Sequence, residues 1–362
     1  MKVLVRVLIL MAIMLTLFFY SDQSVKENDV LEAPNSSGQA IPQPNLQPPN
    51  ETNSIARPAS GLSTLIGQDT SGLISQFGGP NRIEASAFGY SWWIYNESPS
   101  LFMMVGVNKD IINQVYIAGN KLDAAPFQIQ QSVEEVYRFT IIQNEISVGI
   151  EDNNYTFSLG QEDVMNRILV EFDGLYAQVY VDKVDREIEA IRFTDPKTLV
   201  LHQPYEMSYK GDYLAPSVPS TSEQKEIDEA NERQTFDLTN LFRLRHDIRQ
   251  VEPDLSLSMV ARKHSEDMAI QNYFSHESPN YGDLEDRLKE AEIPFTTAGE
   301  NIAAFYFDPI EVVHGWLNSP DHREMLLNED FTHVGSGAFG KYYTQNFVER
   351  EISELPKADN ER

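Results

Sequence analysis

The sequence predicts an α+β protein with two folded domains separated and flanked by polar segments. At 362 residues the chain is too long for one ordinary core. Residues 62–205 show one helical segment followed by β-rich runs, apparently twice, which predicts a smaller α+β domain with α-β-β-β half-repeats. Residues 238–348 begin with helical periodicity and end in two β-rich runs, which predicts a second α+β domain.

Composition excludes several classes of function. Acidic residues number 55 against 28 Lys and Arg, and the formal net charge is −27. Because such a chain repels phosphate backbones, we expect no nucleic-acid partner. The charge would suit divalent cations or basic partners, but solubility alone accounts for it. The chain has no Cys, so disulfides, thiolate metal sites and a lipid-modified N-terminal Cys are excluded.

Residues 1–20 are predicted to be a signal or membrane anchor. Lys2 and Arg6 flank an apolar run that ends at Tyr20, and positive charge before the run places the rest of the chain outside the cytoplasm. The run lacks a small-x-small cleavage site, which favours an uncleaved anchor over a removed signal peptide. We therefore expect an extracytoplasmic protein, membrane-anchored or secreted.

Residues 21–60 are rich in Pro, Asn and Gln and poor in large apolar side chains. Such a segment cannot bury enough surface to offset its ordering entropy, so a disordered linker is predicted. Residues 211–234 are predicted to be a second linker, in which residues 223–232 form either a solvated helix or a mobile segment. Residues 351–362 are taken as a C-terminal tail.

The N-terminal domain is predicted over residues 61–210. Its first helix carries Leu65, Leu73 and Phe77 on one face and stops at Gly78-Gly79-Pro80. Asp173-Gly174 between two β-rich runs is a strong hairpin signal. Strands are expected at residues 90–95, 101–107, 112–117, 146–150, 155–159, 168–172, 175–181 and 188–193, with a helix at 132–139. Trp92-Trp93 would serve either as a sugar-stacking platform or, as we prefer, as core.

The C-terminal domain is predicted over residues 235–350. A helical face at i, i+3, i+4, i+7 and i+11 includes His264, for which a buried histidine with one hydrogen bond is preferred over a metal ligand. Asp254, Asp283 and Asp308 are expected to cap helices. Residues 332–339 and 342–348 should form a hairpin through Gly340-Lys341.

Two further histidines lie near a break between helices. Ser319 is predicted to cap a short helix that contains His322 near its N-terminus. The positive end of a helix disfavours imidazolium, so His322 should be biased toward the neutral form that can bind a metal or accept a proton. His314 is expected to lie on the surface.

Three motifs and a C-terminal tripeptide together resemble the CAP superfamily (cysteine-rich secretory proteins, antigen 5, pathogenesis-related 1) in its bacterial form. They are Phe274-Ser275-His276, Gly299-Glu300-Asn301-Ile302-Ala303, the run from Trp316 to Arg323, and Tyr343-Thr344-Gln345. The resemblance covers roughly residues 238–348 and implies an α-β-α sandwich with a small antiparallel sheet. The motifs at 77–82 and 89–92 resemble the domain often found N-terminal to bacterial CAP domains.

The resemblance implies a cleft lined by His276 and Glu300, with His322 as a bacterial-type third member. A carboxylate beside the apolar Ile302 and Ala303 needs a partner, and His276 is the natural one. The compatible alternative is that Glu300 accepts hydrogen bonds from neighbouring backbone amides as a structural brace. Tyr342 stands where animal and plant members carry a second His, and Ser319 where they carry a second Glu. Ser319, Tyr342 and His264 are therefore expected to line the cleft without completing a tetrad.

Three functions remain open at this stage. The first is an extracytoplasmic module that binds a ligand, an envelope component, or a zinc-like divalent metal through His276, Glu300 and His322. The second is a scaffold whose N-terminal domain makes the functional contact. The third is a hydrolase with Glu300 as base and a histidine as its partner. The protease and hydrolase motifs His-Glu-x-x-His and Gly-x-Ser-x-Gly do not occur, so the enzyme is ranked last and no catalytic residue is assigned.

Overall fold

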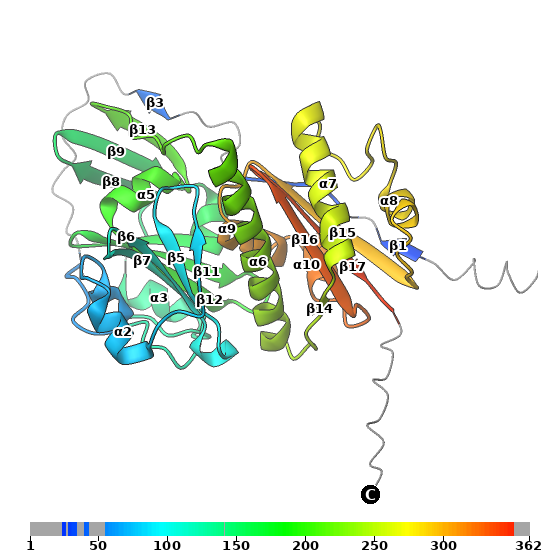
Figure 1. Ribbon diagram of the computed structural model, residues 1–362. Helices are drawn as coiled ribbons and strands as arrows, with labels where there is room; N and C mark the ends of the chain where they lie inside the picture. Colours follow the sequence, from blue (N-terminus) through cyan, green and yellow to red (C-terminus); the bar gives the residue numbers. More distant parts are fainter. Residues whose placement is uncertain (1–23, 27, 35–39, 43–54, 141, 351–362) are drawn as a thin grey trace, which may run out of the picture. The chain divides into compact units, whose positions relative to one another are not determined.

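The computed structural model describes residues 24–26, 28–34, 40–42, 55–140 and 142–350 (Figure 1). The chain divides into two compact units. Unit 1 comprises Met1–Leu31, Leu238–Ala304 and Pro320–Arg362, and unit 2 comprises Glu32–Asp237 and Phe305–Ser319. The predicted anchor at 1–20 and tail at 351–362 lie outside the described residues. Within the described ranges, no helix is both long and apolar enough to cross a membrane.

Unit 1 is built on a mainly antiparallel sheet. Its strands follow the order β1 (Ser24–Lys26), β15 (Thr297–Ala304), β17 (Tyr342–Val348), β16 (His333–Phe339) and β14 (Glu252–Pro253), and β2 (Leu31–Glu32) also pairs with β15. The predicted hairpin is confirmed, since Phe339 pairs with Tyr342 across Gly340-Lys341. β1 and β14 add short parallel strands to β15 and β16.

The helices of unit 1 are α7 (Leu255–Gln271), α8 (Leu284–Glu290) and α10 (Pro320–Leu326). Asp254 and Asp283 cap α7 and α8 as predicted. Helix α7 packs on β16 (Figure 1), and a Cβ atom at Gly337 would lie 2.0 Å from the backbone nitrogen of Arg262. Glycine is therefore required where helix and strand backbones touch. The predicted apolar stripe of α7, His264 included, is buried.

Unit 2 contains two sheets. The larger follows the order β10 (Arg167–Phe172), β11 (Leu175–Asp182), β12 (Glu187–Thr194), β7 (Ile111–Ile117), β6 (Met103–Asn108), β5 (Ser91–Tyr95) and β4 (Arg82–Ala85). The smaller follows the order β3 (Ile41–Pro42), β13 (Glu206–Lys210), β9 (Asn153–Ser158) and β8 (Glu145–Ile150). The Asp173-Gly174 hairpin is confirmed by the pairing of Phe172 with Leu175.

The helices of unit 2 are η1 (Leu62–Leu65), α2 (Ser71–Phe77), η2 (Pro99–Leu101), α3 (Val133–Phe139), α4 (Gln161–Asn166), α5 (Pro196–His202) and α9 (Pro309–Leu317). The two expected half-repeats are not equivalent. Helix α2 precedes four strands of the large sheet, whereas α3 precedes β8 and β9, which belong to the other sheet. The short elements β4, α4, α5 and β13 were not predicted from the sequence.

Helix α6 (Thr221–Arg245) begins inside the stretch predicted to be a linker. The helix of the second alternative is therefore present from Thr221 onward (Figure 1), but it is not solvated, because Ile227, Ala230 and Asn231 are buried. Trp92 is 2 % exposed, and Trp93 packs against the core of the large sheet. Of the two alternatives for this pair, the structure therefore supports core packing over a surface platform for sugars.

The described parts of residues 21–60 contain β1, β2 and β3 in place of the disordered spacer predicted there. Backbone pairing to an existing sheet edge explains this difference, because it needs no large apolar side chains of the segment's own. Small contributions add to it: Val25 packs against the core between α7 and α8, and Ile55 bridges to Phe172.

Helix α9 belongs to unit 2, although the sequence places it within the C-terminal domain. Asp308 caps it as predicted, and both carboxylate oxygens of Asp308 accept hydrogen bonds from the guanidinium of Arg192, at 2.9 and 2.8 Å. Glu311 accepts from Arg167 at 2.5 Å and from the Tyr180 hydroxyl at 2.6 Å. The helix is thus tied to the large sheet by buried charged groups.

The prediction that His314 lies on the surface is wrong. The residue is 4 % exposed, its Nε2 lies 2.9 Å from the Tyr116 hydroxyl, and its ring stacks on Tyr180 at 4.2 Å. Its position three residues before the buried Leu317 and four after the buried Ile310 places it on the apolar face of α9. The large sheet supplies the aromatic surroundings and the hydrogen-bond partner that this imidazole needs.

Candidate functional site

Glu300 is the centre of the candidate site in unit 1. It lies within β15 between buried residues and is 2 % exposed, so its carboxylate needs compensating partners. Its Oε1 accepts a hydrogen bond from Nδ1 of His276 at 2.8 Å, which is the pairing predicted from the sequence. Its Oε2 accepts from the guanidinium of Arg287 at 2.6 Å. Both carboxylate oxygens are therefore engaged.

Arg287 is a site residue that the sequence reading missed. It lies on α8, and its side chain is 4 % exposed. Besides Glu300, its guanidinium donates to the carbonyl oxygens of His276 at 2.8 Å and Gly282 at 3.0 Å. It thereby fixes the loop that carries His276 to strand β15. Its place beside Leu284 and Leu288 on the buried face of α8 was the available signal.

The electrostatics of the site keep Glu300 ionised. Burial by itself would raise the pKa of the Glu300 carboxyl. The positive charge of Arg287, with smaller contributions from His264 and His276, outweighs burial and lowers this pKa to about 2. Glu300 is accordingly an anion at every physiological pH.

A second set of hydrogen bonds holds the His276 loop. Asp267 of α7 accepts from the hydroxyls of Tyr273 at 2.6 Å and Ser278 at 2.7 Å. It also lies 3.3 Å from the side-chain amide of Asn280. These bonds fix residues on both sides of His276, so the position of the imidazole is set by α7, α8 and β15 together.

His264 lies beside the site but does not bind Glu300 directly. Its Nε2 is 3.1 Å from the carbonyl oxygen of Ser275, to which it donates, and 3.9 Å from Oε1 of Glu300. Burial is the main cause that lowers the pKa of His264 to about 4. This agrees with the buried histidine with one hydrogen bond that the sequence predicted.

His276 is the site residue that meets solvent. Its side chain is 20 % exposed. Nδ1 is held by Glu300, while Nε2 points the other way and lies 3.5 Å from the carbonyl oxygen of Asp29. Because the two ring nitrogens are fixed on opposite sides, Nε2 is the atom that the site offers to a ligand.

His322 lies on α10, where its backbone carbonyl accepts from the side-chain amide of Asn301 at 3.1 Å. Burial, followed by the charge of His276, lowers the pKa of His322 to about 4. The imidazole is thus neutral near pH 7, with burial as the main cause instead of the helix terminus. Within the described parts of the chain, His276, Glu300 and His322 do not bring three ligand atoms within 4.8 Å of one another.

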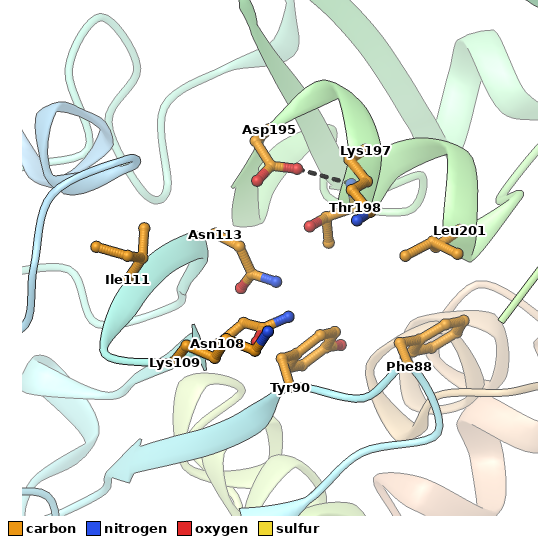
Figure 2. A pocket seen from close by; sticks show the side chains of 10 residues that line it. All are labelled: Phe88, Tyr90, Asn108, Lys109, Ile111, Asn113, Asp195, Lys197, Thr198 and Leu201. Carbon is orange, nitrogen blue, oxygen red and sulfur yellow. Dashed lines mark hydrogen bonds between the residues drawn. The ribbon is translucent and has the colours of Figure 1, made fainter. Parts of the chain in front are cut away.

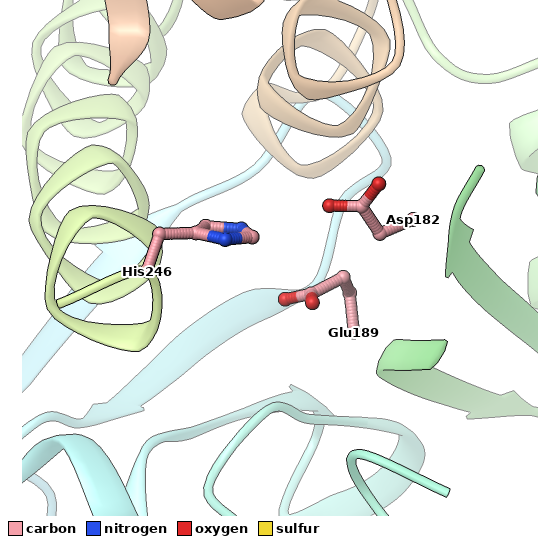
Figure 3. Close-up of side chains that lie close together, drawn as sticks. All are labelled: Asp182, Glu189 and His246. Carbon is pink, nitrogen blue, oxygen red and sulfur yellow. The ribbon is translucent and has the colours of Figure 1, made fainter. Parts of the chain in front are cut away.

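Tyr342 and Ser319 are the two remaining residues that were predicted to line the cleft. Tyr342 begins β17, and its ring lies 6.4 Å from that of Phe274, two residues before His276. Ser319 directly precedes α10, and the boundary between the two units falls just after it. Figure 3 shows the side chains of Asp182, Glu189 and His246. Asp182 and Glu189 lie in unit 2 and His246 lies in unit 1, so the three residues do not form a site within either unit.

Unit 2 has a pocket of its own, with a volume of about 320 Å³ (Figure 2). The rings of Phe88 and Tyr90 form one wall, and Lys109 and Lys197 lie at exposed positions on the lining. Asn113 is 8 % exposed and points its amide into the space between them (Figure 2). The lining therefore combines aromatic rings with two ammonium groups and the carboxylate of Asp195.

Comparison with known proteins agrees with the fold and motifs described above. Residues 66–205 match the CAP-associated N-terminal family, and residues 236–348 match the cysteine-rich secretory protein (CAP) family. A relative is 40 % identical over 296 residues, which are 82 % of this chain and 86 % of the relative. The chain therefore belongs to the cysteine-rich secretory protein family, in the form with a CAP-associated N-terminal region.

That relative is YlbC of Bacillus subtilis, whose name describes an uncharacterized membrane protein. A second relative, the uncharacterized protein YkwD of the same species, is 43 % identical over 121 residues, which are 33 % of this chain and 47 % of YkwD.

Two solved structures share the fold. An extracellular protein containing an SCP domain from Bacillus anthracis is 37 % identical with a TM-score of 0.77, covering 85 % of this chain and 100 % of that one. A cysteine-rich secretory protein from Staphylococcus aureus is 24 % identical with a TM-score of 0.76, covering 89 % and 98 %, and shows the fold alone. The predicted family and α+β class are confirmed.

Proposed function

We propose that this protein is an extracytoplasmic binding module whose ligand contacts His276. The observation that carries the proposal is the orientation of one imidazole: a buried carboxylate fixes Nδ1, and Nε2 faces outward. Such preorganisation lowers the entropic cost of binding, because the ring does not need to be ordered when the ligand arrives.

The same geometry argues against Glu300 as a general base. Both of its oxygens accept hydrogen bonds, and its pKa is lowered to about 2, with burial opposed by the charge of Arg287. A carboxylate of such low pKa is a weak base near neutral pH, where an effective base has a pKa near the working pH. Glu300 instead holds His276 in place.

Three facts support the extracytoplasmic location. Lys2 and Arg6 flank an apolar run that ends at Tyr20. One relative is named a membrane protein, and a related structure is described as extracellular. Protease treatment of intact cells should degrade the folded part, and intact-mass measurement would show whether residues 1–20 are retained.

Binding is tested by sedimentation of the full chain with isolated bacterial cell walls. We expect His276→Ala to weaken binding by about tenfold or more, as for other central interface residues. His333→Ala is the matched control, because this histidine lies on β16, which β17 separates from β15. Equal binding by both variants and the parent protein would reject His276 as the contact.

Metal binding is a second candidate, favoured by the outward Nε2 of His276 and the neutral imidazole of His322. Arg287 opposes it, because its positive charge already neutralises Glu300. Calorimetry with Zn²⁺ alone would decide: a metal site predicts that His276→Ala and His322→Ala both abolish binding. Zn²⁺ binding that is unchanged in both variants would exclude this site.

The scaffold hypothesis rests on the pocket of unit 2. If the N-terminal region makes the functional contact, the double substitution Lys109→Ala and Lys197→Ala should remove cell-wall binding while His276→Ala leaves it intact. The opposite pattern supports the cleft. The two variants together therefore separate the two units as sources of binding.

A further inference from the structure

One edge of β15 is paired with a segment from the beginning of the chain. Ser24, Val25 and Lys26 pair in parallel with Thr297, Ala298 and Gly299. The backbone N–H of Ser24 donates to the carbonyl oxygen of Thr296 at 3.0 Å. Val25 packs against the core formed by α7, α8 and β15. The segment thus behaves as an added edge strand.

Beyond this pairing, the same segment continues to Asn301 and His276. The side-chain amide of Asn28 donates to Oδ1 of Asn301 at 2.6 Å, next to Glu300 in β15. The carbonyl oxygen of Asp29 lies 3.5 Å from Nε2 of His276. The outward nitrogen that the site offers to a ligand therefore faces the main chain of this segment.

The segment also contacts helix α10. Lys26 forms an ion pair with Glu324 of α10 at 3.2 Å, and the charge of Asp29 acts on His322 of the same helix. The segment consequently runs beside β15, α10 and the His276 loop, along a path that we call the groove. The contacts are backbone pairing, one apolar side chain, one amide and one cation.

These contacts are of a kind that an extended peptide makes in general. A sheet edge presents unpaired N–H and C=O groups, and a peptide that adds as a strand satisfies them whatever its side chains, while a few side-chain contacts give specificity. Here the specificity would come from side chains like those of Val25, Lys26 and Asn28: an apolar residue, a basic residue directly after it, and an amide two positions further on.

We propose that the groove along β15, ending at His276, is a binding site for an extended peptide and that residues 24–26, 28 and 29 occupy it in cis as a strap. This inference rests on the proposed function, because it names the ligand class of the same cleft. A tethered segment has an effective concentration in the millimolar range, so a free peptide binds only when the strap is displaced.

The test uses the full chain and a fluorescent synthetic peptide with the sequence of residues 24–31 as the probe. A release variant combines Ser24→Pro, Lys26→Ala and Asn28→Ala, which remove one backbone donor and both polar side-chain contacts. We expect the release variant to bind the probe at least tenfold more tightly than the parent chain does, measured by fluorescence anisotropy. Lys225→Ala, which breaks an exposed ion pair on α6, should behave as the parent.

Two results would overturn the inference. One is equal affinity of the release variant for the probe and for a scrambled peptide of the same composition. The other is amide hydrogen exchange of Ser24 in the parent chain at the rate of an unstructured peptide, which would show that the strap is not in place. Adding Asn301→Ala to the release variant should weaken probe binding if the groove is the site.

The outcomes for the two proposals can be told apart. If the release variant ignores the peptide but still binds cell walls through His276, the strap inference fails and the proposed function stands. If it binds the peptide while cell-wall binding is absent in every variant, the groove is a peptide site and the envelope ligand is wrong.

Discussion

The site around Glu300 in unit 1 and the contact between α9 and the large sheet in unit 2 contain the same chemical groups but differ in how far these groups are exposed. Each combines an arginine, a carboxylate and a nearby histidine, all on a sheet or packed against one. In unit 2, His314 is 4 % exposed and is enclosed by Tyr116 and Tyr180. In unit 1, the side chain of His276 is 20 % exposed and keeps one nitrogen directed outward.

The difference shows that exposure of a single ring separates a structural cluster from a candidate site. In both places the charged groups satisfy one another, as buried charges must. Only beside Glu300 does the pairing leave a ring nitrogen, Nε2 of His276, outside the charged cluster, where it faces the main chain of Asp29. The comparison predicts that substitutions in the α9 contact of unit 2 lower stability strongly and leave binding unchanged. It predicts that substitution of His276 lowers binding strongly and stability only slightly.

The largest effect is expected for Asp308→Ala. This change leaves the buried guanidinium of Arg192 without its bidentate partner and removes the cap of α9. Loss of one partner of a buried pair costs about 3–5 kcal/mol of the free energy of unfolding. Urea unfolding followed by Trp fluorescence measures it. Arg186→Ala, whose partner Glu134 is exposed, is the control and should change little.

A somewhat smaller effect is expected from the titration of Glu300. Its pKa is lowered to about 2, because the charge of Arg287 outweighs burial, so the stabilisation is complete above pH 4.5 and is lost as the pH falls toward 2. A shift of this size corresponds to about 3 kcal/mol. The stability difference between the parent and Glu300→Gln should shrink as the pH falls from 5 to 3. A difference that stays constant over this pH range would contradict this account.

Local features of the fold were predictable because they depend on neighbours in the sequence. The caps at Asp254, Asp283 and Asp308 and the turns at residues 173–174 and 340–341 all occur as expected. The buried stripe of α7 also follows from its period. The His276–Glu300 bond could be expected because a buried carboxylate needs a partner and the family motif supplied one.

Partners that lie far apart in the sequence could not be predicted. The faces of α8 and α9 show that Arg287 and His314 occupy inward positions, but a helical period does not name the group on the other side. The strands before residue 60 pair through their backbones, which leave no side-chain pattern. Membership of α9 in unit 2 depends on Arg167 and Arg192, which precede it by more than a hundred residues.

A third prediction concerns His264 and His322. Burial is the main cause that lowers the pKa of each to about 4, so each stabilises the fold above pH 6.5 and this contribution is lost as the pH falls toward 4. Between pH 6.5 and 5 each should remove about 2 kcal/mol from the free energy of unfolding. Urea unfolding at the two pH values measures the slope, and His322→Gln should reduce it. A flat profile in the parent would show that these imidazoles are not buried as described.

The smallest effect on stability, and the sharpest test of the comparison, is expected for His276→Ala. The partly exposed ring leaves Glu300 still bound to Arg287, so we expect a loss of about 1 kcal/mol or less. The matched change His314→Ala removes an enclosed ring from between two tyrosines and should cost about 2–4 kcal/mol. Cell-wall sedimentation should show the reverse order, with binding lost in His276→Ala and kept in His314→Ala. Parallel losses of stability and binding in both variants would mean that the cleft is a structural cluster like that of unit 2.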